Sequence, residues 1–135
     1  MQTKNYFLLA DDDEDDQLLF KEALADIDPT ITCEIARNGV EALAFLQNNL
    51  SEPPTFIFLD LNMPIMNGLK CLSEIKKSVS LKGLPVIIYS TSAHRQYIDE
   101  SMQLGALDFF VKPSDYRGLK DYLRKTAAGV LPGKE

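Results

Sequence analysis

Short apolar runs alternate along the chain with segments in which apolar residues recur every three or four positions. A run without polar alternation, such as Phe56 to Leu59, is typical of a strand buried on both faces of a sheet, whereas the longer period indicates a helix. Each strand-like run is followed by a helical pattern, which predicts an α/β fold: a doubly wound parallel sheet with helices on both faces. The predicted strands are residues 6–10, 31–36, 56–59, 86–89 and 106–111.

Apolar faces and end signals mark the predicted helices. Asn38 would cap the second helix, with Glu41 three residues later as in a capping box, and Ser114 would cap the last helix. The residues expected to face the core, from the first helix to the last, are Leu18, Leu19, Ala23, Leu24 and Ile27; Ala42, Leu43, Phe45 and Leu46; Leu69, Leu72 and Ile75; Ile98 and Met102; Leu119, Leu123 and Ala127.

The length of 135 residues, with 45% hydrophobic and 25% charged residues, fits one soluble globular domain. No apolar run reaches the roughly 20 residues that span a membrane, and residues 1–5 lack the apolar core of a secretory signal, so we expect a cytoplasmic protein. The net charge of -6 argues against nucleic acid as a partner. Cys33 and Cys71 match no zinc or redox spacing and are expected to be buried, reduced thiols.

Polar side chains stand at the ends of four predicted strands: Asp11 and Asp12, Asp60, Ser90, and Lys112. The carboxyl ends of parallel strands meet at one edge of the sheet, which is where such sheets place their ligands. Carboxylates packed together repel one another and raise the pKa of at least one of them, and a divalent cation relieves this repulsion. Oxygen ligands without Cys or His favour Mg²⁺ over zinc.

Asp60 is the candidate phosphoryl acceptor, because it ends the buried run at 56–59 abruptly. Its carboxylate would attack phosphorus in line and form an aspartyl phosphate, with Mg²⁺ (or Mn²⁺) neutralising the developing charge. Lys112 would pair with one phosphoryl oxygen, and Ser90 would donate a hydrogen bond to another. Each residue alone is a weak signal, but their order along the chain is specific.

The first strand is followed by an acidic run from Asp11 to Asp16. Asp15 and Asp16 fall at the start of the first helix, where acids interact favourably with the helix dipole. That explanation does not reach Asp11 and Asp12 at the strand end. The acids after Asp12 are expected to attract cations and to slow small anionic phosphodonors.

In this order of motifs the chain resembles the receiver domain of bacterial two-component response regulators. The residues that carry the resemblance are Asp11-Asp12, Asp60 with Asn62-Met63-Pro64, Asn67-Gly68, Ser90, and Lys112-Pro113. The resemblance runs from about Tyr6 to Ala128 and implies a flavodoxin-like sheet with strand order 2-1-3-4-5. Only Gly129 to Glu135 follow, too short a segment to fold alone, so we expect a stand-alone, CheY-like receiver over residues 1–135, with its core at about 6–128 and no output domain.

The resemblance also implies a role for each residue of the site. Asp60 would be the phosphoacceptor. Asp12, Asp60 and the backbone carbonyl of Asn62 would bind the metal directly, and Asp11 would act through a metal-bound water. Lys112 would bind the phosphoryl group.

Further implied roles concern switching and lifetime. Ser90 and Phe109 would form the switch, and because many members have Tyr at the Phe109 position, this switch would act through packing alone. Asn62 and Ser92 would tune the attack of water and hence the phosphoryl lifetime. A cis peptide bond is implied before Pro113.

The partners follow from the same resemblance. A histidine kinase or a histidine phosphotransfer protein would donate the phosphoryl group, because His94, the only histidine, is expected to be a surface loop residue. An unknown output protein would bind residues 93–125, the fourth helix, fifth strand and fifth helix, where Tyr97, Tyr116 and Tyr122 are expected to be partly core. The domain would be a monomer or weak dimer, and no enzyme beyond catalysing its own phosphorylation and dephosphorylation.

Three alternatives are weaker. A receiver-like adaptor that works without phosphorylation would not need the intact set of site residues. An aspartyl-phosphate hydrolase would need an acid–base carboxylate two residues after Asp60, where Asn62 stands. A flavin-binding module would need a phosphate loop after the first strand, and the acids there would repel the phosphate.

Overall fold

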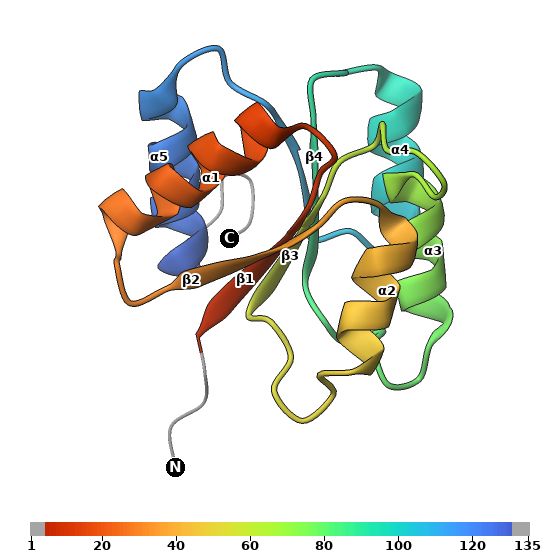
Figure 1. The fold of residues 1–135 in the computed structure, drawn as a ribbon. Coiled ribbons are helices and arrows are strands. Elements are labelled where there is room, and N and C mark those ends of the chain that lie inside the picture. Colours follow the sequence, from red (N-terminus) through yellow and green to blue (C-terminus); the bar gives the residue numbers. More distant parts are fainter. Residues whose placement is uncertain (1–4, 131–135) are drawn as a thin grey trace.

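The computed structural model describes residues 5–130 and shows a parallel sheet between two layers of helices (Figure 1). In chain order the elements are β1 (Tyr6–Ala10), α1 (Glu14–Ile27), β2 (Thr32–Ala36), α2 (Gly39–Gln47), β3 (Phe56–Leu59), α3 (Gly68–Lys77), β4 (Val86–Ser90), α4 (Arg95–Gln103), β5 (Asp108–Val111) and α5 (Tyr116–Ala127). The strand order is β2-β1-β3-β4-β5, and every pair is parallel, so the predicted fold class is confirmed. The expectations for residues 1–4 and for the tail beyond 130 lie outside the described residues.

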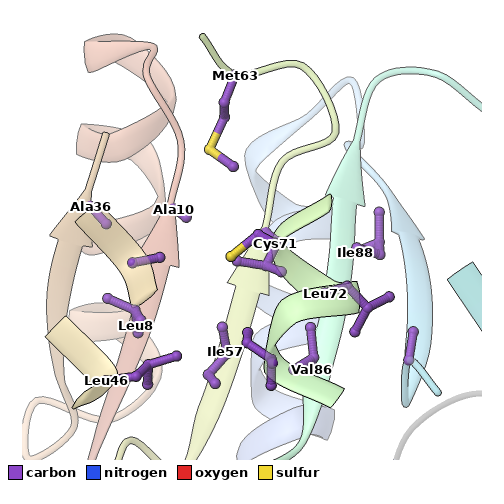
Figure 2. Close-up of a cluster of buried hydrophobic side chains, with 14 of the residues drawn as sticks. Leu8, Ala10, Ala36, Leu46, Ile57, Met63, Cys71, Leu72, Val86 and Ile88 are labelled. Atoms are coloured by element: carbon purple, nitrogen blue, oxygen red, sulfur yellow. The ribbon is translucent and has the colours of Figure 1, made fainter. Parts of the chain in front are cut away.

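The helices α2, α3 and α4 cover one face of the sheet, and α1 and α5 cover the other (Figure 1). On the first face, aliphatic side chains of β1, β3 and β4 meet those of α2 and α3, as Leu8, Ile57, Leu46 and Leu72 show in Figure 2. Each such fully buried side chain contributes roughly 1.5–3 kcal/mol through the hydrophobic effect. This layer fixes the sheet whose carboxyl edge carries the site.

The second face is packed mainly by aromatic rings. Phe20 of α1 meets Phe58 of β3 edge-on at a centroid distance of 5.0 Å. Tyr89 of β4 stacks on Phe110 of β5 at 5.6 Å, and Phe110 stacks on Tyr122 of α5 at 3.6 Å. These contacts anchor α1 and α5 on the sheet, since aromatic pairs add to the stabilisation given by burial.

The core face of α1 agrees only in part with the predicted one. Ala23 and Leu24 are buried and Ile27 packs against the core, as predicted, but Leu18 and Leu19 are 57% and 45% exposed, and Phe20 is buried instead. The spacing of four fits both sets of residues equally well, so the pattern alone does not choose between them. The orientation of α1 follows from Phe20, because its ring packs between the aromatic rings of Phe58 and Tyr89 on the sheet.

Two other predicted core residues, Met102 and Ala127, are also exposed. Ser101 and Thr126 take the neighbouring buried positions. The hydroxyl of Ser101 donates to the carbonyl oxygen four residues earlier at 2.6 Å, and that of Thr126 does so at 2.8 Å. A satisfied hydroxyl can be buried at little cost, which the apolar pattern does not reveal.

The helix caps agree with prediction for α2 but not for α5. The Asn38 carboxamide oxygen accepts the N–H of Glu41 at 2.9 Å, while the Glu41 carboxylate accepts the N–H of Arg37 at 2.9 Å. The N-cap of α5 is Asp115 rather than Ser114. Both residue types are good caps, and the one whose carboxylate reaches the first turn takes the role.

Cys71 is buried, Cys33 is partly buried, and both are free thiols. Burial raises the pKa of each to about 12, so both stay protonated at neutral pH, as expected of unreactive thiols. Over the described residues, every helix falls short of the length and apolar character needed to cross a membrane.

A strained turn lies between β3 and α3. The N–H of Met66 donates to the carbonyl oxygen of Pro64 at 2.6 Å, and Ile65 between them has a φ of 68°. Positive φ is unfavourable for a β-branched residue, and three-residue turns of this hand are rare. Because Ile65 is 82% exposed, burial of its side chain does not offset the strain.

We predict that Ile65→Asn stabilises the domain by about 1 kcal/mol, because Asn tolerates the left-handed region better than a β-branched residue. Urea denaturation measures the change. Ile65→Val keeps the branched Cβ and is expected to leave stability unchanged. An equal gain in both variants, or none in Ile65→Asn, would show that the turn is not strained.

Candidate functional site

An open pocket of about 600 Å³ lies at the carboxyl edge of the sheet. It is lined by Asp12, Asp13, Glu14, Asp15, Asp16, Asp60, Asn62, Thr91 and Lys112. The backbone N–H of Asp60 donates to the carbonyl oxygen of Ala10 at 2.9 Å, so β1 and β3 are paired up to the pocket. The parallel sheet therefore brings the predicted strand-end residues together.

Asp11, Asp12 and Asp60 each place a carboxylate oxygen within 4.8 Å of the other two. Asp11 and Asp60 are buried, whereas Asp12 is exposed to the pocket. This all-oxygen donor set fits a hard divalent cation and is a poor match for zinc. The structure thus supports the predicted triad as a divalent metal site.

The Lys112 ammonium is hydrogen-bonded to three carboxylates. Its Nζ donates to Asp11 Oδ2 at 2.9 Å, to Asp16 Oδ2 at 2.7 Å and to Asp60 Oδ2 at 3.2 Å. It also lies over the Tyr89 ring, 4.9 Å from the centroid. Burial alone would lower the pKa of Lys112, but the bonds to Asp16 and Asp11 outweigh burial and raise it, so this lysine stays charged.

The bond between Asp16 and Lys112 was not predicted from the sequence. An acid in the first turn of α1 is already accounted for by the helix dipole, so Asp16 gave no further signal. Asp13, the N-cap of α1, accepts the N–H groups of Asp15 and Asp16 on one carboxylate oxygen at 2.9 and 3.1 Å. This cap fixes the first turn against the sheet edge and directs Asp16 toward Lys112. Asp16 could have been predicted as a site residue because α1 starts at the candidate site and an acid in its first turn therefore lies near the other site residues.

Burial raises the pKa of Asp11 from 3.8 to about 6, against the opposing effects of a backbone hydrogen bond from Asp13 and of the Lys112 ammonium. Repulsion from Asp60 adds a smaller contribution in the same direction. The expectation that one carboxyl of the site has a raised pKa is therefore confirmed. Its main cause is burial rather than charge repulsion.

The loop after Asp60 holds its carboxylate in place. Asp60 Oδ1 accepts the backbone N–H of Asn62 at 3.1 Å, and the N–H of Gly68 donates to the carbonyl of Leu61 at 3.2 Å. A Cβ on Gly68 would collide with the carbonyl oxygen of Asp60. Gly68 thus allows α3 to start directly against the backbone of the candidate acceptor.

The residues expected to form the switch lie behind the pocket rather than in its wall. Ser90 is fully buried, and its Oγ accepts the N–H of Ser92 at 3.1 Å. Thr91 lines the pocket in its place. Phe109 is partly buried against the aliphatic layer under α2 and α3. Ser92 Oγ is buried and, within residues 5–130, lacks a hydrogen-bond partner.

Two further expectations concern a cis peptide bond before Pro113 and a surface position for His94. The expected cis bond before Pro113 is wrong, because no peptide bond of the described chain is cis; even before proline the trans form is the more stable one. His94 is an exposed residue at the start of α4, as predicted, with its ring 5.6 Å from that of Tyr97.

The three tyrosines expected to be partly core behave differently from one another. Tyr122 is buried, and its hydroxyl donates to Asp108 at 2.5 Å. Tyr116 is partly buried, and its hydroxyl donates to Asp26 at 2.8 Å. Tyr97 is exposed, so the expectation fails for it.

A doubly wound sheet with an acidic triad and a partly buried lysine at its carboxyl edge is the architecture of a signalling receiver. The family model of the response regulator receiver domain matches residues 7–124, and the chain belongs to this family. Members of the family act in two-component signalling and interact with histidine kinases.

Individual relatives agree with this assignment. The response regulator Rcp1 of Synechocystis sp. is 35% identical over 127 residues, which span 91% of this chain and 84% of Rcp1. The crystal structure of the phosphorylated cyanobacterial phytochrome response regulator RcpA is 30% identical, with a TM-score of 0.84 over 99% of this chain and 98% of that chain. The crystal structure of the Mn(2+)-bound form of Rcp1 is 29% identical, with a TM-score of 0.78 over 96% of each chain.

We predict that Gly68→Ala destabilises the domain by roughly 2 kcal/mol, because the new methyl group and the Asp60 carbonyl cannot share the same space. Thermal or urea denaturation measures the loss. Gly83→Ala is the matched control, since a Cβ added at Gly83 would have nothing within 4 Å of it. Equal effects of the two substitutions would contradict the close approach.

The raised pKa of Asp11 predicts a pH dependence in metal-free protein. The proton is bound more tightly in the folded than in the unfolded chain, so this carboxyl favours folding fully below about pH 4, and the contribution is lost as pH rises through about 6. Relative to Asp11→Asn, the wild type should lose on the order of 2 kcal/mol between pH 4 and 7. Urea denaturation in EDTA measures both proteins; a stability difference that does not change with pH would contradict the prediction.

Proposed function

We propose that this receiver accepts a phosphoryl group on Asp60, in a Mg²⁺-dependent reaction, from a histidine kinase or a histidine phosphotransfer protein. The observation that carries the proposal is the Lys112 ammonium, 3.2 Å from Asp60 Oδ2 in an open pocket with two further carboxylates beside it. A positive charge and an oxygen-rich cation site on the same carboxylate are what phosphoryl transfer to that carboxylate needs.

In the proposed step, an Asp60 oxygen forms a bond to phosphorus while the bond from phosphorus to the donor breaks. The electron pair of that bond leaves with the donor, an imidazole nitrogen or an acetate oxygen. Lys112 pairs with a phosphoryl oxygen and offsets the charge brought into the pocket. The N–H of Asn62 keeps Asp60 oriented through its bond to Oδ1.

Asp12, Asp60 and the backbone carbonyl of Asn62 would bind the cation directly, with Asp11 acting through a bound water. The oxygen triad supports this assignment, and so does the existence of an Mn(2+)-bound form of the relative Rcp1. When bound, Mg²⁺ (or Mn²⁺) supplies positive charge that neutralises the phosphoryl oxygens. Asn62 in the pocket wall, and Ser92 behind it, are proposed to tune the attack of water and so the lifetime of the phosphoryl group.

The signal is proposed to leave through a change in protein contacts. Ser90 would have to turn from its bond with the N–H of Ser92 to reach a phosphoryl oxygen, and Phe109 would follow by repacking. The surface formed by α4, β5 and α5 would then meet an output protein. Exposed Tyr97, Met102 and Val111 on this surface support that role. The domain is proposed to be cytoplasmic and to be a monomer or weak dimer.

The proposal predicts one added phosphoryl group in the intact mass after incubation with acetyl phosphate and Mg²⁺. The adduct should be absent in EDTA and in Asp60→Asn, which keeps the size of the side chain. Lys112→Met should lower its yield at least tenfold, because the phosphoryl group loses its nearest positive charge. Glu41→Gln, outside the pocket, controls for handling.

An adduct that persists in Asp60→Asn would show that another residue is the acceptor. If wild type forms no adduct, the test is repeated with a phosphorylated histidine-kinase domain as donor. Failure there as well would favour an adaptor that works without phosphorylation.

A further inference from the structure

Asp16 makes the shortest of the three bonds to Lys112, at 2.7 Å, yet it is not part of the metal triad. We propose that Asp16 holds Lys112 in the unphosphorylated state and must release it before the lysine can bind a phosphoryl oxygen. Asp16 is thus a positioning residue that limits the rate of phosphorylation. The inference rests on the proposed role of Asp60.

The hydrogen-bond donors of Lys112 are all in use. A lysine ammonium has three N–H groups, and in this structure Asp11, Asp16 and Asp60 accept one bond each. A phosphoryl oxygen is a further acceptor, so one existing bond has to be given up.

The three carboxylates differ in what it costs them to lose the ammonium. The Asp11 side chain is 0% exposed, so its carboxylate is poorly solvated without Lys112. The bond to Asp60, whose side chain is 9% exposed, keeps the ammonium beside the acceptor until the phosphoryl group reaches that carboxylate. The Asp16 side chain is 31% exposed and can exchange the ammonium for water. Release of Asp16 is therefore the least costly route, but it still breaks a charge-assisted hydrogen bond.

Asp16 is held in place and does not simply move along with the lysine. The N–H of Asp16 is fixed by the Asp13 cap, and Phe20 anchors the next turn of α1 in the core. Lys112 is confined on one side by the Tyr89 ring. A short aspartate on a fixed helix loses contact when the ammonium shifts toward Asp60.

Asp15, the acid next to Asp16, provides a matched control. Asp15 lines the same pocket, lies in the same turn of α1 and carries the same charge, and its carboxylate makes no bond to Lys112. Neutralising Asp15 therefore removes repulsion of an anionic donor without freeing the lysine. Asp13 is unsuitable for this purpose, because its carboxylate caps the helix.

The experiment measures phosphorylation by acetyl phosphate and subsequent dephosphorylation for wild type, Asp15→Asn and Asp16→Asn, each at saturating Mg²⁺. At low salt, Asp15→Asn is expected to be a few-fold faster than wild type, and this gain should vanish at 1 M salt, where the Debye length is about 3 Å. Asp16→Asn is expected to be about tenfold faster and to keep most of that gain at 1 M salt, because one charge-assisted bond no longer has to break.

Dephosphorylation rates should agree within about twofold for all three proteins, because in the phosphorylated form Lys112 has already left Asp16. This split between the two rates separates the inference from a general structural effect of Asp16→Asn. The inference is overturned if Asp16→Asn matches Asp15→Asn at both salt concentrations, if it is slower than wild type, or if both rates change equally. Absence of phosphorylation in wild type with both acetyl phosphate and a phosphorylated histidine-kinase domain would instead overturn the proposed function, and the inference with it.

Discussion

The ammonium group of Lys112, which follows β5, joins the end of β1 and the start of α1 to the end of β3. It bonds to Asp11 at the end of β1, to Asp16 on α1 and to Asp60 at the end of β3. Without it, the buried carboxylates at the sheet edge would carry uncompensated negative charge, which strongly destabilises a fold. The charge of Lys112 therefore allows the fold to remain stable with an acidic pocket that can bind a cation.

Burying carboxylates at the sheet edge costs free energy. The apolar layers on either side of the sheet offset this cost. The aliphatic layer under α2 and α3 (Figure 2) and the aromatic layer under α1 and α5 each bury a cluster of apolar side chains. They allow Asp11 to stay buried although its ionised form is disfavoured there. The strained turn at Ile65 is a further local cost next to the site, and such costs tend to gather where a protein acts.

The sequence was sufficient to predict the sheet, because unbroken apolar runs have few interpretations other than buried strands. It was also sufficient to place the three carboxylates of the acidic triad and Lys112 together, because a parallel sheet brings the carboxyl ends of its strands to one edge. The helix faces were harder to predict. A spacing of four is satisfied by Leu19 as well as by Phe20, and only the aromatic pocket of the sheet decides between them.

Asp16 and Gly68 show what a one-dimensional pattern does not contain. Asp16 had a sufficient local explanation as an acid at a helix start, and its bond to Lys112 depends on how α1 sits on the sheet. Gly68 marks a close approach between α3 and the Asp60 backbone, which appears only in three dimensions. The location of Ser90 behind the pocket likewise depends on side-chain direction at a strand end, which its position in the sequence leaves open.

The identity of the residue that carries the phosphoryl group can be measured by chemical trapping. Borohydride reduces an acyl phosphate to an alcohol, so a phosphorylated aspartate becomes homoserine, and peptide mapping by mass spectrometry then gives its position. We predict homoserine at residue 60 alone, and only when Mg²⁺ was present during phosphorylation. Homoserine at Asp12 or another acid of the pocket, or a phosphoryl group found on His94, would contradict the assignment of Asp60 as the acceptor.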